Sequence, residues 1–167
     1  MIVIGIDPGT AITGYGIVRE NEDGSLEMVG YGAILTPPEL SMPERLLELS
    51  RKLTELLLLH RPNSGAVEKL FFQRNVRTAL SVGQARGVVL LSLAQSGLPV
   101  WEYTPLEVKQ AVAGYGGADK NQVQQMVRAL LGLQDIPHPD DAADALAIAI
   151  CHLHSVRMKS IFEEAKR

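Results

Sequence analysis

The sequence predicts an α/β fold in which a five-stranded mixed sheet is flanked by helices. Residues 2–6 form a nearly continuous apolar run, typical of a central strand covered on both faces. Two further strand patterns follow directly, and helical and strand-like spacings then alternate along the chain. With 167 residues and a hydrophobic content of 46%, the chain can bury a sizeable core as one domain.

The first three strands are expected to form an antiparallel meander. Pro8-Gly9 ends the first strand directly after Asp7. Residues 13–19 and 26–35 have strand character, and a turn signal at 21–24 separates them.

A helix and a crossover strand come next. Leucines at helical spacing predict a helix over 41–60, with Ser41 as a candidate cap and Pro43 in its first turn. A crossover of this kind returns the strand at 65–68 parallel to the first strand. We therefore expect Asp7 and Glu68 to lie toward the same edge of the sheet.

The remaining segments complete the layers of the fold. The predicted elements are a helix at 76–96, a strand at 98–103, and helices at 105–112, 123–131 and 141–154. We expect residues 1–158 to form one domain and the charged residues 159–167 to form a mobile tail.

Composition narrows the class of protein. Cys151 is the single cysteine, so an intramolecular disulfide is excluded. Residues 1–6 are too short and uncharged for a secretory signal, and the leucine run at 56–59 is far shorter than the ~20 apolar residues of a membrane span. We expect a cytoplasmic protein without a membrane partner.

Basic residues gather in the middle of an otherwise acidic chain. The net charge is −3, yet residues 69–128 carry seven Lys or Arg and only three Asp or Glu. Cations for phosphates and rings for bases lie together here, which favours nucleic-acid binding. A solvated helix face explains the arginines equally well. The residues are Lys69, Arg74, Arg77 and Arg86, beside Phe71 and Phe72.

Four acids stand where folding alone gives little reason for them: Asp7, Glu68, Asp141 and Asp144. If the fold gathers them, two carboxylates ~4 Å apart repel by roughly 4 kcal/mol at a surface-like dielectric. Such a cluster needs divalent cations, and hard oxygen ligands favour Mg²⁺ or Mn²⁺ over zinc. Asp141 and Asp144 are three apart on a predicted helix, so both project from one side.

Structural alternatives exist for the acids. Asp140 and Asp141 near a helix start complement the helix dipole, and Asp140 is interpreted as a cap. That explanation does not extend to Asp144, the single polar residue of an otherwise apolar segment. Asp7, followed by Pro8-Gly9-Thr10, also suits a phosphate-binding hairpin or a plain turn.

Two lysines are candidate phosphate contacts. Lys120 opens a predicted helix after a glycine loop, and Lys109 lies in the preceding helix. Solubilising surface charge is the alternative for both. Gly83 and Gly87 allow close approach of another helix, within the fold or across a dimer.

The histidines carry no assignment. His152 and His154 are two apart and face different sides of a helix, so they cannot chelate as a pair and are expected to be structural or surface residues. His138, before the acids, could approach the site, but its role and that of the loop 134–140 stay open.

Six motifs follow one another along the chain: Gly5-Ile6-Asp7-Pro8-Gly9, Thr13-Gly14-Tyr15-Gly16, Val67-Glu68-Lys69-Leu70-Phe71-Phe72, Gly83-Gln84-Ala85-Arg86-Gly87, Val108-Lys109-Gln110 and Asp141-Ala142-Ala143-Asp144-Ala145-Leu146-Ala147. Their order and spacing are far more specific than any one of them. Taken together, they resemble the RuvC-type Holliday junction resolvases over about residues 1–155.

The resemblance implies an RNase H-like fold and a homodimeric, metal-dependent endonuclease that makes paired nicks in opposing strands of four-way junction DNA. It assigns catalysis and two Mg²⁺ ions to the four acids, with Mn²⁺ as an alternative ion. Phe71 would insert among bases, and Lys109 and Lys120 would contact the scissile phosphate. Junction-binding and branch-migration proteins would be its partners.

Two other functions are compatible with parts of the sequence. An actin-like phosphate-binding or kinase-type module shares the hairpin after Asp7, although such folds normally need two domains of this kind. A non-catalytic protein that binds branched DNA is the other alternative, and four intact carboxylates speak against it.

Overall fold

One mixed sheet of five strands organises the part of the chain that is described. The computed structural model describes residues 1–69 and 76–164, apart from the side chains at 76, 77, 160 and 164. The strand order is β3-β2-β1-β4-β5, with the first three antiparallel and β4 and β5 added in parallel. This confirms the predicted sheet. The strands are β1 (Ile2–Asp7), β2 (Ile12–Glu20), β3 (Leu26–Leu35), β4 (Ser64–Glu68) and β5 (Val100–Tyr103).

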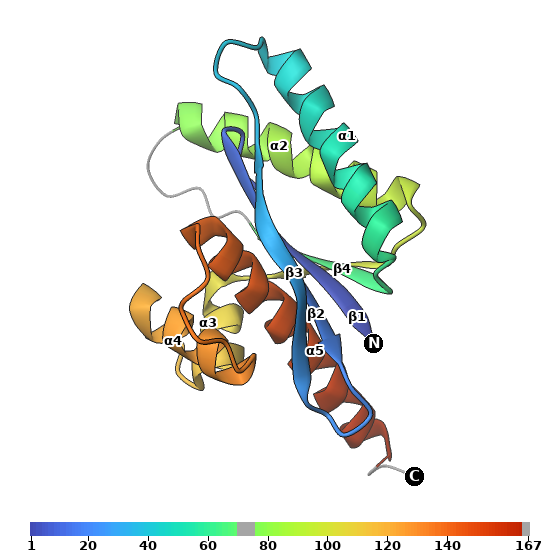
Figure 1. The fold of residues 1–167 in the computed structure, drawn as a ribbon, viewed down its shortest axis with the longest axis vertical. Helices are drawn as coiled ribbons and strands as arrows, with labels where there is room; N and C mark the ends of the chain where they lie inside the picture. Colours follow the sequence, from blue (N-terminus) through green and yellow to red (C-terminus); the bar gives the residue numbers. More distant parts are fainter. Residues whose placement is uncertain (70–75, 165–167) are drawn as a thin grey trace.

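Helices cover both faces of the sheet (Figure 1). α1 (Met42–His60) and α2 (Val76–Gln95) lie on one face. The other face carries α3 (Pro105–Ala113), α4 (Lys120–Leu130) and α5 (Asp140–Glu164). The predicted helices at 41–60, 76–96, 105–112 and 123–131 are therefore all present, with ends shifted by a few residues.

The two-residue period of the strands divides the core into two clusters. Ile4 and Ile6 of β1 point to the α1 and α2 side, where they pack with Leu53. Val3 of β1 and Ala66 of β4 point to the α5 side. Side chains at odd positions of β1 and even positions of β4 therefore face α5.

Glycines on β1 and β2 allow α5 to pack directly on the strand backbone. A Cβ atom on Gly5 would collide with the Ala145 carbonyl oxygen and lie 2.6 Å from the Ala149 nitrogen. A Cβ on Gly16 would lie 2.7 Å from the Leu146 nitrogen. Only glycine fits at such an approach.

Helix α5 is longer than the sequence pattern indicated. The prediction ended this helix at His154, but it continues through Glu164, so residues 159–164 of the predicted tail are helical. Its last turns pass the β2–β3 turn, where the Arg157 side chain donates to the Gly24 carbonyl oxygen at 3.4 Å (Figure 1).

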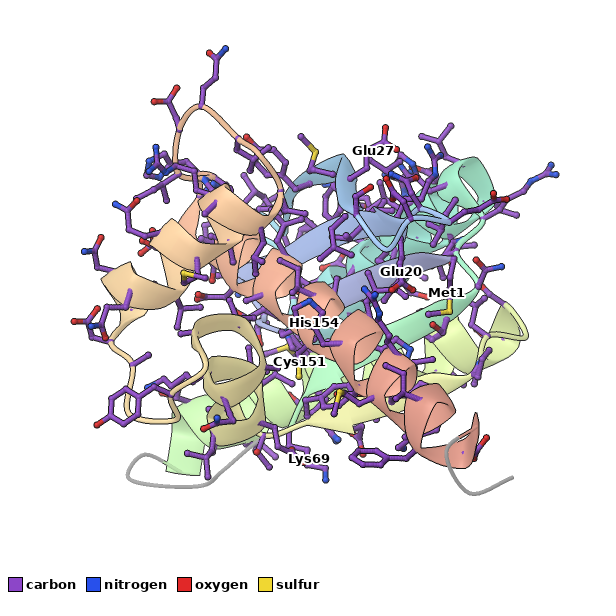
Figure 2. All side chains as sticks on the ribbon, turned by 90° about the horizontal axis from the view of Figure 1, so that it is seen from below. Met1, Glu20, Glu27, Lys69, Cys151 and His154 are labelled. Carbon is purple, nitrogen blue, oxygen red and sulfur yellow. The ribbon has the colours of Figure 1, made fainter. Side chains whose placement is uncertain are left out.

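Two labelled residues show how α5 contacts α3 (Figure 2). The Cys151 thiol lies 3.7 Å from the Glu107 carbonyl oxygen, and His154 Nδ1 donates to the Ala111 carbonyl oxygen at 3.1 Å. Burial raises the pKa of the Cys151 thiol to about 12, so this cysteine is a protonated core residue.

None of the helices within residues 1–69 and 76–164 combines the length and the hydrophobicity needed to cross a bilayer.

Replacing Gly5 with Ala tests the close packing of α5. The added methyl group meets helix backbone that has no room to retreat, so we expect Gly5→Ala to lower the free energy of unfolding by about 1–3 kcal/mol. Gly30→Ala is the matched control in the same sheet, because its Cβ would lie 3.6 Å from His60, an ordinary contact. Thermal and urea unfolding measure both. Equal stability of the two variants would contradict the packing described here.

Candidate active site

Two of the four predicted acids lie side by side at the ends of neighbouring strands. Ile6 of β1 pairs with Val67 of β4, which brings the next residues, Asp7 and Glu68, to the same edge of the sheet. Both side chains lie on the α5 side, in phase with Val3 and Ala66. The parallel crossover predicted from the sequence is confirmed.

The other two acids lie on the first turns of α5. Close packing sets how near this part of α5 lies to the sheet, since a Cβ on Gly14 of β2 would collide with the Asp141 carbonyl oxygen. Asp144 follows one turn later, and the next six residues, 145–150, are all buried. The start of α5 is therefore held against the sheet edge that carries Asp7 and Glu68.

The Asp7 carboxyl lies within electrostatic range of the other three acids. Burial and the negative charges of Glu68, Asp144 and Asp141 together raise the pKa of Asp7 to about 7, with burial as the largest cause. The ammonium of Lys120 acts in the opposite direction but does not compensate.

Two of the other acids, Glu68 and Asp144, also have a raised pKa. Burial, and then the charge of Asp144, raise the pKa of Glu68. Burial also raises the pKa of Asp144, with Asp140 and Asp141 adding to it, while Lys120 lowers it. The site holds more negative charge than its own cation balances.

Lys120 is the cation placed within this cluster. Asp119 caps α4 by accepting from the Gln122 backbone N–H, so Lys120 becomes the first helical residue. Its Nζ lies 3.1 Å from Asp140 Oδ2 and 3.2 Å from Asp144 Oδ2. Partial burial acts to lower the pKa of Lys120, but the bond to Asp140 and the charge of Asp144 outweigh it, so the pKa is raised.

Asp140 has a role that the sequence interpretation missed. It was interpreted as a helix cap, yet besides Lys120 it accepts a hydrogen bond from Gln124 Nε2 at 3.1 Å. It thus anchors the lysine from the outer side. No sequence signal joins positions 120 and 140, because a loop and a helix separate them.

A pocket opens between the acids and the two predicted lysines. Its volume is about 210 Å³, and Glu68, Asp144, Lys109 and Lys120 line it together with apolar residues of α3, α4 and α5. A pocket lined by both carboxylates and lysines suits a phosphodiester, because the carboxylates can hold cations and the lysines can contact the phosphate oxygens.

The donor set fits hard divalent cations. Four carboxylates lie near a single lysine, Lys120, and carboxylate oxygens are the ligands that hard divalent cations prefer. Within the described residues, no three His, Cys, Asp or Glu side chains are already arranged as a ready-made ion site. The Asp144 carboxylate is paired with Lys120 instead, with 3.2 Å between Oδ2 and Nζ.

The structure describes only some of the residues that were predicted to contact DNA. Phe71 and Arg74 lie outside the described residues, as does the side chain of Arg77. Arg86 is on α2, across the sheet from the acids, and forms an ion pair with Glu102 of β5. The exposed His138 acts on Asp140 only through its charge, as one of the smaller causes that lower the pKa of that acid.

The hairpin after Asp7 does not offer its hydroxyl groups to a phosphate. Thr10 Oγ1 donates to the Ser81 carbonyl oxygen at 2.7 Å, and Thr13 Oγ1 donates to the Gly9 carbonyl oxygen at 2.6 Å. These bonds remove the hydroxyl donors that an actin-like phosphate-binding hairpin would use.

Sequence comparison gives the relatives of the chain. A family model described as crossover junction endodeoxyribonuclease RuvC matches residues 3–152. The protein of that name from Syntrophomonas wolfei is 56% identical over 165 residues, covering 99% of this chain and 95% of the relative. The one from Desulfitobacterium hafniense is 63% identical over 158 residues, covering 95% of each.

Comparison with solved structures finds similar folds among Holliday junction resolvases. The Thermus thermophilus RuvC in complex with a Holliday junction substrate superposes with a TM-score of 0.90 at 40% identity, covering 95% of this chain and 96% of that one. The yeast mitochondrial Holliday junction resolvase Ydc2 has a TM-score of 0.67 at 16% identity over 91% and 77% of the chains, a likeness of fold. This chain belongs to the RuvC family of crossover junction endodeoxyribonucleases.

Proposed function

We propose that this endonuclease cuts four-way DNA junctions at a metal centre held by Asp7, Glu68, Asp141 and Asp144. The observation that carries the proposal is the placement of Asp7 and Glu68 at the ends of paired strands beside the first turns of α5, where burial and the neighbouring carboxylates raise the pKa of Asp7. Four acids forced together at a sheet edge, next to a pocket with two lysines, are adapted to cations and a phosphate.

The acids would bind two Mg²⁺ ions, with Mn²⁺ as an alternative. Such ions, when bound, activate a water and stabilise the leaving 3′ oxygen of an in-line displacement. The resulting nicks leave 5′-phosphate and 3′-hydroxyl ends that a ligase can rejoin.

The lysines would hold the DNA backbone. Lys120 now shares Asp140 and Asp144, and its Nζ can turn to a phosphate oxygen once cations neutralise the acids. Lys109 lines the same pocket from α3 and would add a second positive charge beside the scissile phosphate. Phe71 and the arginines at 74 and 77 stay predicted DNA contacts.

We further propose a homodimer that pairs through α2. Leu80 and Leu91 are 64% and 57% exposed on this helix. Between them, a Cβ on Gly83 or Gly87 would come within 4 Å of no other element among the described residues. The four positions recur at helical spacing on one face. A two-fold dimer suits paired cuts on a two-fold junction.

Branch-migration partners and a cytoplasmic location stay predictions.

Asp144→Asn tests the metal centre. Loss of one carboxylate should lower junction nicking by about 10²–10³-fold, comparable to the loss of one preorganised hydrogen-bond donor to the charge that develops in a transition state. Junction binding, measured by gel shift without divalent ions, should persist. Asp135→Asn, which changes charge equally in the exposed loop before α5, should cut normally. Wild-type nicking by Asp144→Asn would exclude this residue as a ligand.

The raised pKa of Asp7 predicts how stability depends on pH. Its pKa is about 7 when folded and near 3.8 when unfolded, so the native state holds the extra proton between these values. Stability of the metal-free protein should therefore fall as pH rises from about 4 to about 7, by up to about 4 kcal/mol from this group.

Asp7→Asn should remove this part of the pH dependence and stabilise the metal-free protein at pH 7. It should also abolish stabilisation by added Mg²⁺, which wild-type protein shows. Calorimetry across pH, with and without Mg²⁺, measures both effects. Identical stability profiles for the two proteins would contradict the assignment.

Leu91→Glu tests the dimer. A charge on the exposed α2 face should yield monomers in sedimentation and unpaired nicks in place of double cuts. Leu47→Glu is the control, because Leu47 is 70% exposed on α1. A monomeric wild type with full paired cutting would refute the proposal.

A further inference from the structure

A buried histidine of α5 joins this helix to β4, which carries Glu68, and to the neighbouring strand β5. His152 of α5 is 1% exposed, and both of its ring nitrogens are hydrogen-bonded. Nε2 lies 2.9 Å from Ser64 Oγ at the start of β4. Nδ1 lies 2.8 Å from the Tyr103 hydroxyl at the end of β5.

Burial lowers the pKa of His152 to about 4, so the ring is neutral at physiological pH. One nitrogen then donates and the other accepts, and each hydroxyl can take the complementary role. The three side chains satisfy one another inside the core, where an unpaired polar group would be costly.

The two ends of this contact have matching spacings. Ser64 and Glu68 are four positions apart on one face of β4, which corresponds to about 13 Å. Asp144 and His152 are eight positions apart on α5, which corresponds to about 12 Å. When His152 meets Ser64, Asp144 is therefore brought level with Glu68.

The interface between α5 and the sheet needs a contact that fixes the position of the helix along its axis. Ala145 and Ala149 pack on Gly5 of β1, and Ala142 lies against Gly14 of β2, so small side chains make much of this contact smooth. Smooth apolar contact resists separation but specifies position along the helix axis weakly, because dispersion and burial are not directional. Hydrogen bonds from one ring to two strands are directional.

We propose that Ser64, His152 and Tyr103 form a clamp that sets the axial position of α5 on β4 and β5, and so holds Asp141 and Asp144 in register with Glu68 and Asp7. His152 is thus a positioning residue for metal binding and nicking. This inference rests on the proposed role of the four acids. The backbone supports it too, since the Lys69 N–H, directly after Glu68, donates to the Tyr103 carbonyl oxygen at 2.8 Å.

The test removes the two hydroxyl groups and keeps the histidine. Ser64→Ala and Tyr103→Phe each delete one oxygen atom from the clamp, and the double variant deletes both. Ser50→Ala is the matched control, because Ser50 Oγ bonds Ser92 Oγ at 3.1 Å on the opposite face of the sheet. All proteins are compared well below their melting temperatures.

For the double variant we expect Mn²⁺ affinity without DNA to fall by about tenfold, the low end for groups that orient metal ligands. The nicking rate at saturating junction should fall by a similar factor, with junction affinity unchanged. Ser50→Ala should lower stability alone. If the double variant fails to fold, the two single variants carry the test, with smaller losses in the same two readouts.

A clamp variant that loses stability but keeps wild-type Mn²⁺ affinity and nicking overturns the proposal. Asp144→Asn separates this failure from a failure of the site. Normal cutting by Asp144→Asn overturns the ligand assignment itself. Normal cutting by the double variant, with Asp144→Asn inactive, overturns the clamp alone.

Discussion

The site depends on the direct packing of α5 against the backbone of β1 and β2. Because Gly5, Gly14 and Gly16 carry no side chains, the helix lies close enough for its first two turns to meet the ends of β1 and β4. The carboxylates gathered there repel one another. Fully buried side chains of α5, such as Leu146 and Ile150, each contribute roughly 1.5–3 kcal/mol, so a few of them offset that repulsion.

Much of this arrangement can be read from the sequence, because strand and helix periods are local properties. The apolar run before Asp7 and the short strand before Glu68 defined two parallel strands, and parallel neighbours bring their carboxyl ends together. Asp144 was conspicuous as the lone charge in an apolar helix. Positions of three acids thus followed from patterns of a few residues each.

What escaped prediction involves pairs far apart in the chain. His152 was expected to be structural or on the surface; it is buried, but its partners Ser64 and Tyr103 lie 88 and 49 positions away. Arg86 was predicted as a DNA contact or as part of a solvated helix face, and its ion pair with Glu102 of β5 was not foreseen. The periodicity of a helix in the sequence does not indicate which strand an arginine on that helix will contact. The end of α5 was missed because its last turns expose Met158 and Phe162, which blurs the apolar face.

With the pKa of Asp7 at about 7, cation binding at the proposed metal centre would be an exchange reaction. A cation that binds there would displace the proton held by this carboxyl and release it to solvent. Acidification would therefore compete with the metal at Asp7. On this proposal, a cell that becomes more acid would weaken the centre without any change in its metal supply, and an alkaline shift would strengthen it.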